Sequence, residues 1–248
     1  MSDLEAAIAR TRQGVCAVLR IHMNRPEKRT PKRVKPAQYG LTFAGSAFGI
    51  SDDRYIVTAY HVFNDGQPRV NADRFYAFVV PDNGPTAYHF PVVGFPLEDP
   101  ILDIAVLEIG PCATPGHHVR GLPITSRPVQ DGTRVLTYGF PAPVIANAGV
   151  SEMGDYLGGN FFLKSHANAG IVAGQFVLDD GPIYEFNVGW YNGESGGPVC
   201  LLEPFAVAAV MKSYRGIQAK HGIVPGPHAA RPVRPVLDRL LAFGAQQA

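Results

Sequence analysis

Short runs of apolar and β-branched residues, separated by glycine, proline and other turn residues, recur along most of this sequence. Such runs predict β-strands. The first half contains six of them, at residues 15–21, 42–50, 55–58, 75–80, 89–95 and 104–109, and the second half contains seven, at residues 133–138, 161–164, 170–177, 183–188, 198–202, 205–211 and 221–224. Because no helical pattern lies between them, the strands suit closed antiparallel barrels, which leave no exposed edges.

Helical spacing is confined to the two ends of the chain. Residues 1–13 predict a short amphipathic helix that Ser2 or Asp3 caps. Near the C-terminus, four apolar residues share one side of a helix that Gly244 ends: Val236, Leu237, Leu240 and Leu241. We therefore expect an all-β protein with an N-terminal helix at 1–13, a first barrel at 14–112, a linker at 113–124, a second barrel at 125–230 and a C-terminal helix at 231–248.

Two segments do not follow the strand pattern. Residues 25–35 are basic and broken by prolines, which predicts a solvated flexible loop; docking to an acidic partner or nucleic acid is the alternative. Residues 144–159 contain several glycines and alanines and predict a long surface loop. The linker contains His117 and His118, but no acidic or cysteine partner is close in sequence, so we expect no metal site there.

Composition and charge narrow the class of protein. The chain has 248 residues, with 22 Lys and Arg against 21 Asp and Glu, and the resulting net charge of +1 argues against a general nucleic-acid binder. No apolar run reaches the roughly 18 residues that a membrane span requires. The N-terminus lacks the basic start and apolar core of a secretory signal.

The three cysteines indicate a reducing compartment. Cys16 and Cys200 lie in apolar, strand-like runs, whereas Cys112 lies in the linker. Their number is odd and their spacing does not match that of zinc ligands, so we expect buried free thiols and no metal. Together with the absence of a secretory signal, this predicts a cytoplasmic protein.

The stretch 193–198 reads Gly-Glu-Ser-Gly-Gly-Pro and leads into an apolar strand. Glycines on both sides of Ser195 let the backbone turn sharply and leave its N–H groups free. The N–H groups of Gly193 and Ser195 can then point at one spot and hold a developing oxyanion. Alone, such a string is also typical of a tight turn, so the neighbouring motifs decide between the two interpretations.

Two upstream motifs favour a reactive serine. An apolar run from residue 56 ends at His61, and Asp103 directly precedes an alternating apolar strand. Taken separately, a histidine after a strand is usually structural or exposed, and an aspartate before a strand is often a turn residue. Because all three motifs occur, in the order His61, Asp103, Ser195, we favour a single active site over three unrelated structural residues.

These motifs together resemble the chymotrypsin-like serine peptidases, in particular their disulfide-free, HtrA-like bacterial branch. The matching segments follow that family's order over roughly residues 14–240: 45–50, 58–62, 103–107, 138–141, 193–198 and 222–225. The sequence departs from the family at Tyr60, where Ala is usual, and at Glu194, where Asp or Asn is usual. No further stretch that would form a PDZ-type peptide-binding module follows, so we expect none.

The resemblance implies two six-stranded chymotrypsin-like barrels with the active site between them. It further implies a serine endopeptidase in which Ser195 is the nucleophile, His61 the base and Asp103 the residue that orients His61. The oxyanion hole would consist of the Gly193 and Ser195 N–H groups, the substrate would be a polypeptide, and neither a metal nor an organic cofactor would be required. A catalytically silent binding or scaffold protein with the same fold is the alternative, and the intact triad favours the enzyme.

Substrate preference is predicted from fewer residues. Gly189 occupies the place where the trypsin branch has Asp, so a preference for Arg or Lys is not supported. The pocket wall is expected from the strand after the serine loop, at Ala209, Val210, Met211 and Lys212. The Ala and Val residues suggest a small or aliphatic pocket, and the alternative is that Lys212 or His166 binds an acidic side chain.

Control of the activity is the last expectation from the sequence. We find no activation cleavage site, so a zymogen step is not expected. We instead expect residues 144–159 to adopt a misplaced state that disturbs Gly193, and residues 25–35 to bind an activating or regulatory protein partner. The isolated protein would then have low basal activity.

Overall fold

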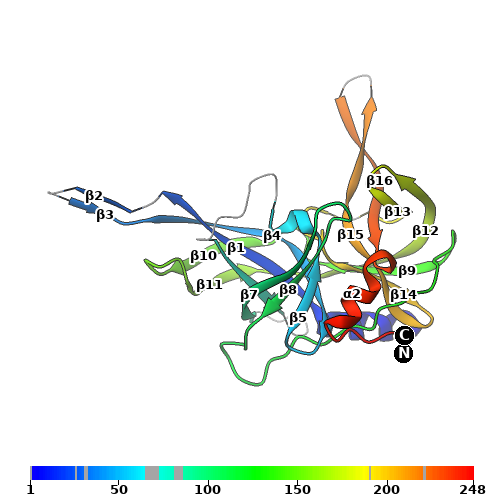
Figure 1. Ribbon diagram of the computed structural model, residues 1–248, viewed down its shortest axis with the longest axis horizontal. Coiled ribbons are helices and arrows are strands. Elements are labelled where there is room, and N and C mark those ends of the chain that lie inside the picture. The colour runs from blue at the N-terminus through cyan, green and yellow to red at the C-terminus, as the bar shows by residue number, and fades with distance from the viewer. Residues whose placement is uncertain are drawn as a thin grey trace.

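The computed structural model describes residues 2–25, 27–30, 33–64, 73–80, 86–189, 191–219 and 222–248. These residues form two closed six-stranded antiparallel barrels that stand beside each other, with a helix at each end of the chain (Figure 1). This confirms the all-β, two-barrel fold that the sequence predicts. The residue limits given above for the individual domains stay a prediction.

The first barrel has the strand order β1-β4-β5-β8-β7-β6. Its strands are β1 (Val15–Arg25), β4 (Gln38–Ser51), β5 (Tyr55–Thr58), β6 (Arg74–Val79), β7 (Tyr88–Asp99) and β8 (Ile104–Ile109). The expected strands at 55–58 and 104–109 are found with these bounds, whereas β1, β4 and β7 extend beyond the expected ones. Apolar side chains such as Phe48, Ile56 and Leu107 are fully buried and fill the barrel.

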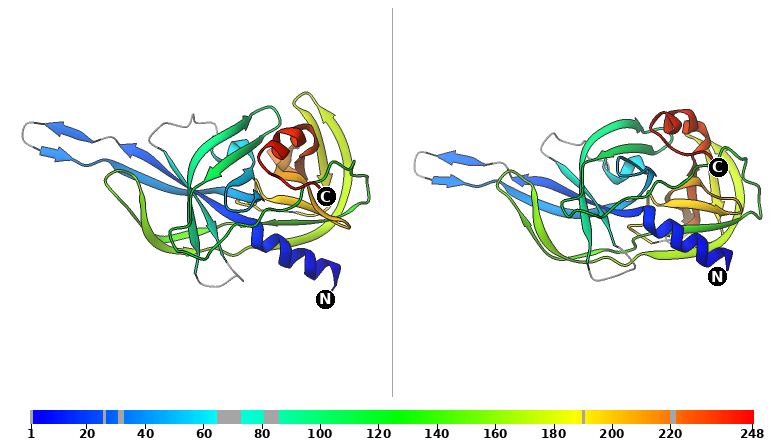
Figure 2. Two further views of the ribbon diagram at one scale, coloured as in Figure 1. Left: turned by 60° about the horizontal axis from the view of Figure 1, so that its bottom comes forward. Right: turned by 90° about the horizontal axis from the view of Figure 1, so that it is seen from below.

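A long arm extends from the first barrel. Strands β1 and β4 remain paired from Val15 opposite Phe48 to Arg25 opposite Gln38, and β2 (Lys28–Thr30) pairs with β3 (Arg33–Lys35) at the far end. Figures 1 and 2 show this arm projecting away from both barrels. The expectation of a loop at 25–35 was therefore wrong for the described part, because β1 and β4 already hold both segments antiparallel. Pro26, Pro31 and Lys32 of that segment lie outside the described residues.

The second barrel has the strand order β12-β13-β16-β15-β14-β9. Its strands are β9 (Arg134–Gly139), β12 (His166–Leu178), β13 (Gly181–Phe186), β14 (Pro198–Leu202), β15 (Phe205–Ala219) and β16 (Gly222–Pro232). Strands β15 and β16 are much longer than the expected 205–211 and 221–224, and they form a second projecting hairpin (Figure 1). His221, the first residue of the expected last strand, lies outside the described residues.

A β-hairpin replaces the surface loop that the sequence predicts at 144–159. Strand β10 (Val144–Val150) pairs with β11 (Tyr156–Phe162) in a separate two-stranded sheet, which also contains part of the strand expected at 161–164. The Phe161 ring contacts those of Phe43 and Phe78 in the first barrel at centroid distances of 5.3 and 5.1 Å. These aromatic contacts hold the hairpin against the first barrel. The prediction of a loop gave too much weight to the glycines of this segment.

Short helices pack on the barrels at both chain ends. Helix α1 (Asp3–Gly14) begins with a capping box between Ser2 and Glu5 and packs against β9 and β14. At the C-terminus, a single 3-10 turn, η3 (Arg234–Val236), precedes α2 (Leu237–Ala242), and Arg239 binds Asp99 of the first barrel at 2.5 Å. Among the described residues, no helix has the length and apolar character needed to cross a membrane.

The two barrels share apolar core. The buried cluster that fills the first barrel continues through Leu136 and Tyr138 of β9 to Cys200 and Val207 of the second barrel. A further buried cluster around Val135, Val172 and Met211 fills the remainder of the second barrel. The barrels are therefore packed against each other through side chains, and the linker is not their sole connection.

The cysteines provide a test of this packing. Burial raises the pKa of both Cys16 and Cys200 to about 12, whereas Cys112 is partly exposed, and all three thiols are free. Because the thiolate is the reactive form, we expect a disulfide reagent at about pH 8 to modify Cys112 alone in the folded protein and all three cysteines after denaturation. The protein should be prepared without reductant, and recovery of a single thiol from the denatured chain would contradict this expectation.

Candidate active site

His61 and Asp103 are held together by side-chain and backbone contacts. His61 lies in the 3-10 turn η1 (Tyr60–Val62) that follows β5, and its Nδ1 is 2.9 Å from Asp103 Oδ2. The His61 N–H also donates to Asp103 Oδ1 at 3.0 Å, and the Tyr60 N–H donates to the Asp103 carbonyl at 3.2 Å. A carboxylate at Nδ1 favours the tautomer with the proton on Nδ1, which leaves Nε2 able to accept a proton.

Asp103 occupies a strained backbone position. Its φ is +52°, in the left-handed region that residues other than glycine rarely adopt. The preceding turn is fixed by Asp99, whose Oδ1 accepts the Leu102 N–H at 2.9 Å. The Asp103 side chain is only 8% exposed, and its contacts to His61 and Tyr60 hold it in this conformation. Such strain is typical of functional sites.

The Ser195 loop is anchored to both barrels. The Ser195 carbonyl accepts the Ser46 N–H of β4 at 2.7 Å, and the Gly196 N–H donates to the Met211 carbonyl of β15 at 2.7 Å. Gly196 has a φ of +87°, and a Cβ there would collide with Ser46 O and Thr58 Oγ1. Only glycine allows this close approach, which brings the segment leading to His61 against the loop that carries Ser195.

Hydrogen bonds to the carbonyls of the loop fix the direction of the peptide group before Gly193. The Asn192 carbonyl accepts the Ala142 N–H at 2.8 Å, and the C=O and N–H of a trans peptide point in opposite directions, so the Gly193 N–H faces away from Ala142. Gly193 has a φ of +100°, and its carbonyl accepts Ser46 Oγ at 2.7 Å. No acceptor within the described part of the chain bonds to the N–H of Gly193 or Ser195.

The Ser195 hydroxyl points to the backbone of β15. Its Oγ donates to the Lys212 carbonyl at 2.5 Å, and no hydrogen bond joins it to His61 among the contacts of the described residues. The structure therefore pairs His61 with Asp103, whereas the expected contact between His61 and Ser195 is not made. A nucleophile and its base are often poorly aligned without substrate and become aligned when substrate binds.

Glu194, which the sequence identified only as a departure from the family, is a buried carboxyl group beside the nucleophile. The residue is 1% exposed, and its Oε2 accepts the Tyr191 N–H at 2.5 Å. Burial raises the pKa of Glu194 to about 7, and the hydrogen bond from Tyr191 opposes that shift. Its Oε1 has no partner among the described residues, so the charged form is poorly compensated. No pattern in the sequence predicted that Glu194 is buried.

The residues expected to form a substrate pocket differ in their surroundings. The side chains of Ala209, Val210 and Met211 are all buried within the barrel cores. Lys212 is partly exposed, and its Nζ lies 3.4 Å from Asp180 Oδ2. Gly189 lies in the segment that leads into the Ser195 loop. That these residues select the substrate stays a prediction.

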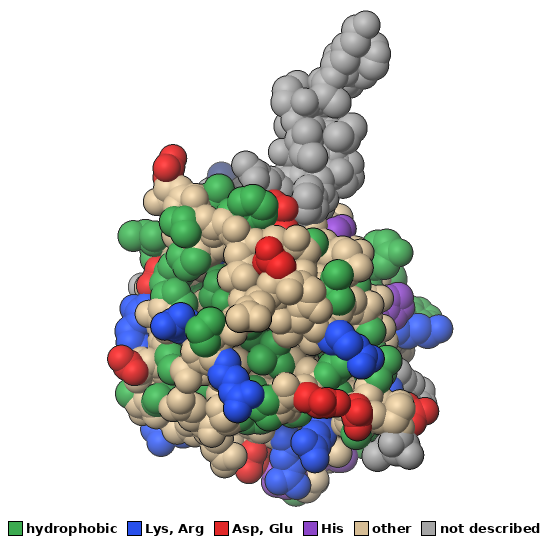
Figure 3. Space-filling view, turned by 90° about the vertical axis from the view of Figure 1, so that its right-hand side faces the viewer, with side chains coloured by type: hydrophobic (Ala, Val, Ile, Leu, Met, Phe, Trp, Pro, Cys, Tyr) green, Lys and Arg blue, Asp and Glu red, His purple; other side chains and the backbone are tan. Residues whose placement is uncertain are grey.

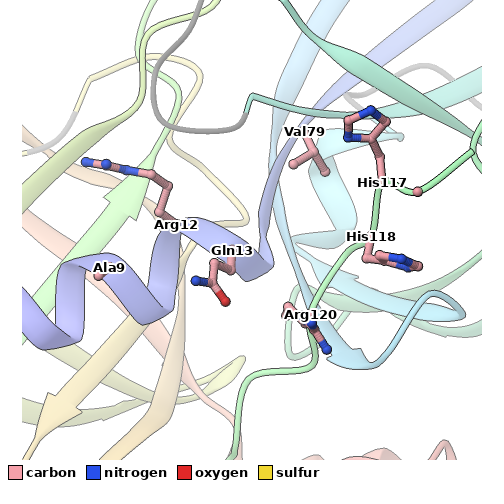
Figure 4. Close-up of a pocket in the computed structure, with 8 residues that line it drawn as sticks. Ala9, Arg12, Gln13, Val79, His117, His118 and Arg120 are labelled. Carbon is pink, nitrogen blue, oxygen red and sulfur yellow. The ribbon is translucent and has the colours of Figure 1, made fainter. Parts of the chain in front are cut away.

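A separate cavity of about 390 Å³ lies between α1 and the linker, lined in part by Arg12, Arg120, His117 and His118 (Figure 4). Three of these side chains are engaged elsewhere: Arg12 binds Tyr138 Oη, His118 binds Asp53 and the His117 ring stacks on Tyr88. Within the described ranges, no group of three His, Cys, Asp or Glu side chains is placed to hold a metal ion. We therefore do not assign this cavity to the candidate active site around His61 and Ser195.

Comparison with known proteins defines the class. The profile of the trypsin-like peptidase domain family matches residues 45–208, which is more than half of the chain. The chain belongs to this family, and its enzyme class is that of the serine-type endopeptidases. A comparison with curated protein sequences found no match.

Solved structures with the same fold include the HtrA-type protease AlgW and Deg5, as the sequence resemblance indicated. The HtrA-type protease AlgW, solved with a decapeptide, is 17% identical with a TM-score of 0.64, over 98% of this chain and 67% of that chain. Deg5 is 18% identical with a TM-score of 0.59, over 98% of both chains. At this identity the similarity establishes the fold.

Substitution of Glu194 should change how stability depends on pH. Because folding raises this pKa from 4.5 to about 7, the folded state binds a proton that the unfolded chain releases, so stability falls as pH rises through this range. Glu194→Gln keeps an oxygen for the Tyr191 N–H and lacks the charge. Relative to the parent, it should gain roughly 1–3 kcal/mol in unfolding free energy between about pH 5 and pH 8. Denaturant titrations at both pH values measure this, and an equal difference at both would contradict it.

Proposed function

We propose that the protein hydrolyses peptide bonds through an acyl-enzyme, with Ser195 as nucleophile, His61 as general base and Asp103 as the residue that orients the imidazole. The observation that carries the proposal is the pairing of His61 Nδ1 with the buried Asp103 carboxylate at 2.9 Å. The pairing leaves Nε2 as the basic atom of the site. The Ser195 loop is packed against the same segment through Gly196, Thr58 and Ala59.

The first step requires the Ser195 hydroxyl to leave the Lys212 carbonyl and turn toward His61 Nε2. Exchange of one such hydrogen bond for another costs on the order of 1 kcal/mol, which is small beside a chemical barrier. His61 then takes the hydroxyl proton as Oγ attacks the substrate carbonyl, and returns it to the leaving amine. Asp103 stabilises the imidazolium without itself becoming protonated. A water molecule hydrolyses the acyl-enzyme by the same sequence.

The N–H groups of Gly193 and Ser195 stabilise the charge that develops in this step. The Gly193 and Ser195 N–H groups have fixed directions, because the Ala142 N–H holds the Asn192 carbonyl at 2.8 Å and the Gly197 N–H holds the Glu194 carbonyl at 3.0 Å. Donors that need no reorganisation are worth about 3–4 kcal/mol each in transition-state energy. This chemistry uses groups of the chain itself, and we propose a polypeptide substrate, which agrees with the decapeptide in the AlgW structure.

Removal of the proposed nucleophile or base should abolish cleavage. We expect Ser195→Ala and His61→Ala each to lower kcat by roughly 10⁴-fold or more. Hydrolysis of a fluorescent casein or peptide measures the activity, and the thermal transition should stay close to that of the parent because neither side chain belongs to the barrel cores. Full activity in Ser195→Ala would exclude this serine as the nucleophile.

A fluorophosphonate probe separates an enzyme from a silent binding protein. The probe reacts with an activated serine whatever the substrate preference, so labelling of Ser195 in the parent and its loss in His61→Ala would support the proposal. The hydrogen bond from Ser195 to Lys212 is the one observation that favours the silent alternative. Absence of labelling with and without peptides would favour the binding or scaffold protein.

We also propose a reducing, cytoplasmic location and a regulatory protein partner, supported by the three free cysteines and the projecting arm. The β10–β11 hairpin gives no sign of the misplaced loop that the sequence suggested. Low basal activity is supported instead by the Ser195 hydroxyl, which bonds to the Lys212 carbonyl and not to His61. Figure 3 shows acidic, basic and hydrophobic side chains mixed over one face of the molecule, a surface that does not favour nucleic acid.

Deletion of the end of the arm tests the proposed partner. If the segment 25–35 docks an activator, replacing it with a short glycine linker should leave fluorophosphonate labelling of the isolated protein unchanged and remove any stimulation of casein turnover by the partner. Basal turnover of casein should be low in both forms. Rapid turnover by the lone chain, equal with and without the arm, would contradict the proposal.

A further inference from the structure

A buried guanidinium group fixes the turn between β12 and β13. Arg231 of β16 is 1% exposed, and its Nη2 binds the carboxylate of Asp180 in that turn. Its Nη1 donates to the carbonyls of Gly181 and Pro182 at 3.2 and 3.0 Å. The turn also contacts the first barrel, because a Cβ on Gly181 would lie 3.1 Å from Leu102 Cδ2. Since a buried charge is costly to leave unpaired, these contacts hold the Asp180 carboxylate in one place.

The same carboxylate binds a second cation. Lys212 Nζ lies 3.4 Å from Asp180 Oδ2, the oxygen that also binds Arg231. The side chain of Lys212 is 29% exposed and that of Asp180 is 47% exposed, so water reaches this second ion pair. The buried pair therefore supplies a fixed carboxylate, and the pair with Lys212 is the one that can be made and broken at low cost.

Lys212 is the extra residue of a β-bulge in β15. The register pairs Met211 with Ala230 and Ser213 with Ala229. One residue of β15 is therefore inserted there, and the described register places no residue of β16 opposite it. A bulge interrupts the ladder between two strands and redirects the groups around it, and bulges are frequent beside active sites.

The bulge lies where β15 meets the serine loop. The peptide groups of Met211 bond to the two glycines that follow Ser195, at 2.7 and 2.8 Å. Lys212 continues this pairing with its carbonyl, which accepts the Ser195 hydroxyl at 2.5 Å. The position of that one carbonyl therefore determines whether Ser195 Oγ has a partner that competes with His61.

We propose that Asp180 is a positioning residue that keeps the Ser195 hydroxyl in its resting orientation, by holding Lys212 in the bulge. The contacts run from Arg231 through Asp180 to Lys212, and the carbonyl of that lysine binds Ser195 Oγ. Loss of the ion pair lets the bulge relax, so the hydroxyl turns more readily to His61 Nε2. This inference rests on the proposed function, in which Ser195 is the nucleophile, and gives a structural cause for low basal activity.

Removal of the lysine charge should speed the reaction of Ser195 with a fluorophosphonate. Lys212→Met removes the ammonium group and keeps the backbone carbonyl, so labelling should be about two- to fivefold faster than in the parent, the factor that one partly exposed ion pair represents. Lys212→Arg can still pair with Asp180 and should reverse most of that increase. Lys164→Met is the matched control, because this lysine is exposed between β11 and β12, and it should label at the parent rate.

Asp180→Asn tests the same ion pair from its other side. It should raise the labelling rate as Lys212→Met does, and the double variant should not exceed either single one, because both remove one interaction. Salt screens a partly exposed pair, so raising NaCl from about 0.05 to about 0.5 M should speed labelling of the parent and not of Lys212→Met. If Asp180→Asn fails to fold because Arg231 loses its buried partner, the Lys212 variants and the salt dependence still test the inference.

An NMR measurement separates this inference from the function on which it rests. The nitrogen-15 shift of His61 Nε2 reports, without catalysis, whether the Ser195 hydroxyl donates to the imidazole. Ser195→Ala should leave this shift nearly unchanged in the parent and should move it in Lys212→Met. If no form of the protein is labelled, the proposed function fails and the NMR comparison still tests the positioning role.

Three results would overturn the inference with the peptidase function intact. The first is labelling of Lys212→Met at or below the parent rate. The second is a His61 Nε2 shift that Ser195→Ala does not move in that variant. The third is an equal acceleration in Lys164→Met, which would show that the loss of any lysine charge has the same effect.

Discussion

The geometry of the candidate site depends on Ser46, a fully buried residue of the first barrel. Its N–H binds the Ser195 carbonyl, its Oγ donates to the Gly193 carbonyl and accepts the Phe140 N–H, and its own carbonyl accepts Thr58 Oγ1. One side chain and its peptide groups thus tie the serine loop to β4 and β5. Because buried polar groups are costly to leave unpaired, these bonds act together and hold the loop in a single arrangement.

Backbone conformation adds a second constraint around this residue. Gly193 and Gly196 both have positive φ, and Asp103 adopts the same region without being a glycine. The glycines permit the close approach of the two barrels, and the Asp103 contacts to His61 offset its strain. The site is therefore assembled from rigid strand ends and tight turns, which suits a mechanism in which fixed dipoles stabilise charge.

The fold could be predicted from the sequence because alternation and turn residues repeat along the chain. Strands β5, β8 and β14 were predicted with the bounds found. The β2–β3 arm and the β10–β11 hairpin were missed, because their order comes from pairing with β1 and β4 and from contacts of Phe161 with the first barrel, neither of which leaves a local pattern.

The site was predicted from the sequence less completely than the fold. The motifs around His61, Asp103 and Ser195 indicated the chemistry, and the structure places His61 against Asp103. The hydrogen bond from Ser195 to Lys212 and the burial of Glu194 arise from contacts between segments far apart in the sequence. Sequence spacing contains no information on such contacts until the barrels are closed.

The continuous core between the barrels determines how the protein loses its structure. Leu136, Tyr138 and Cys200 of the second barrel belong to the same buried cluster as the residues that fill the first. Separation of the barrels would expose this surface to water, so neither barrel gains by unfolding before the other. We therefore expect unfolding to be cooperative across both barrels, with both lost in a single transition. A site divided between His61 on one barrel and Ser195 on the other is either complete or lost with the whole molecule.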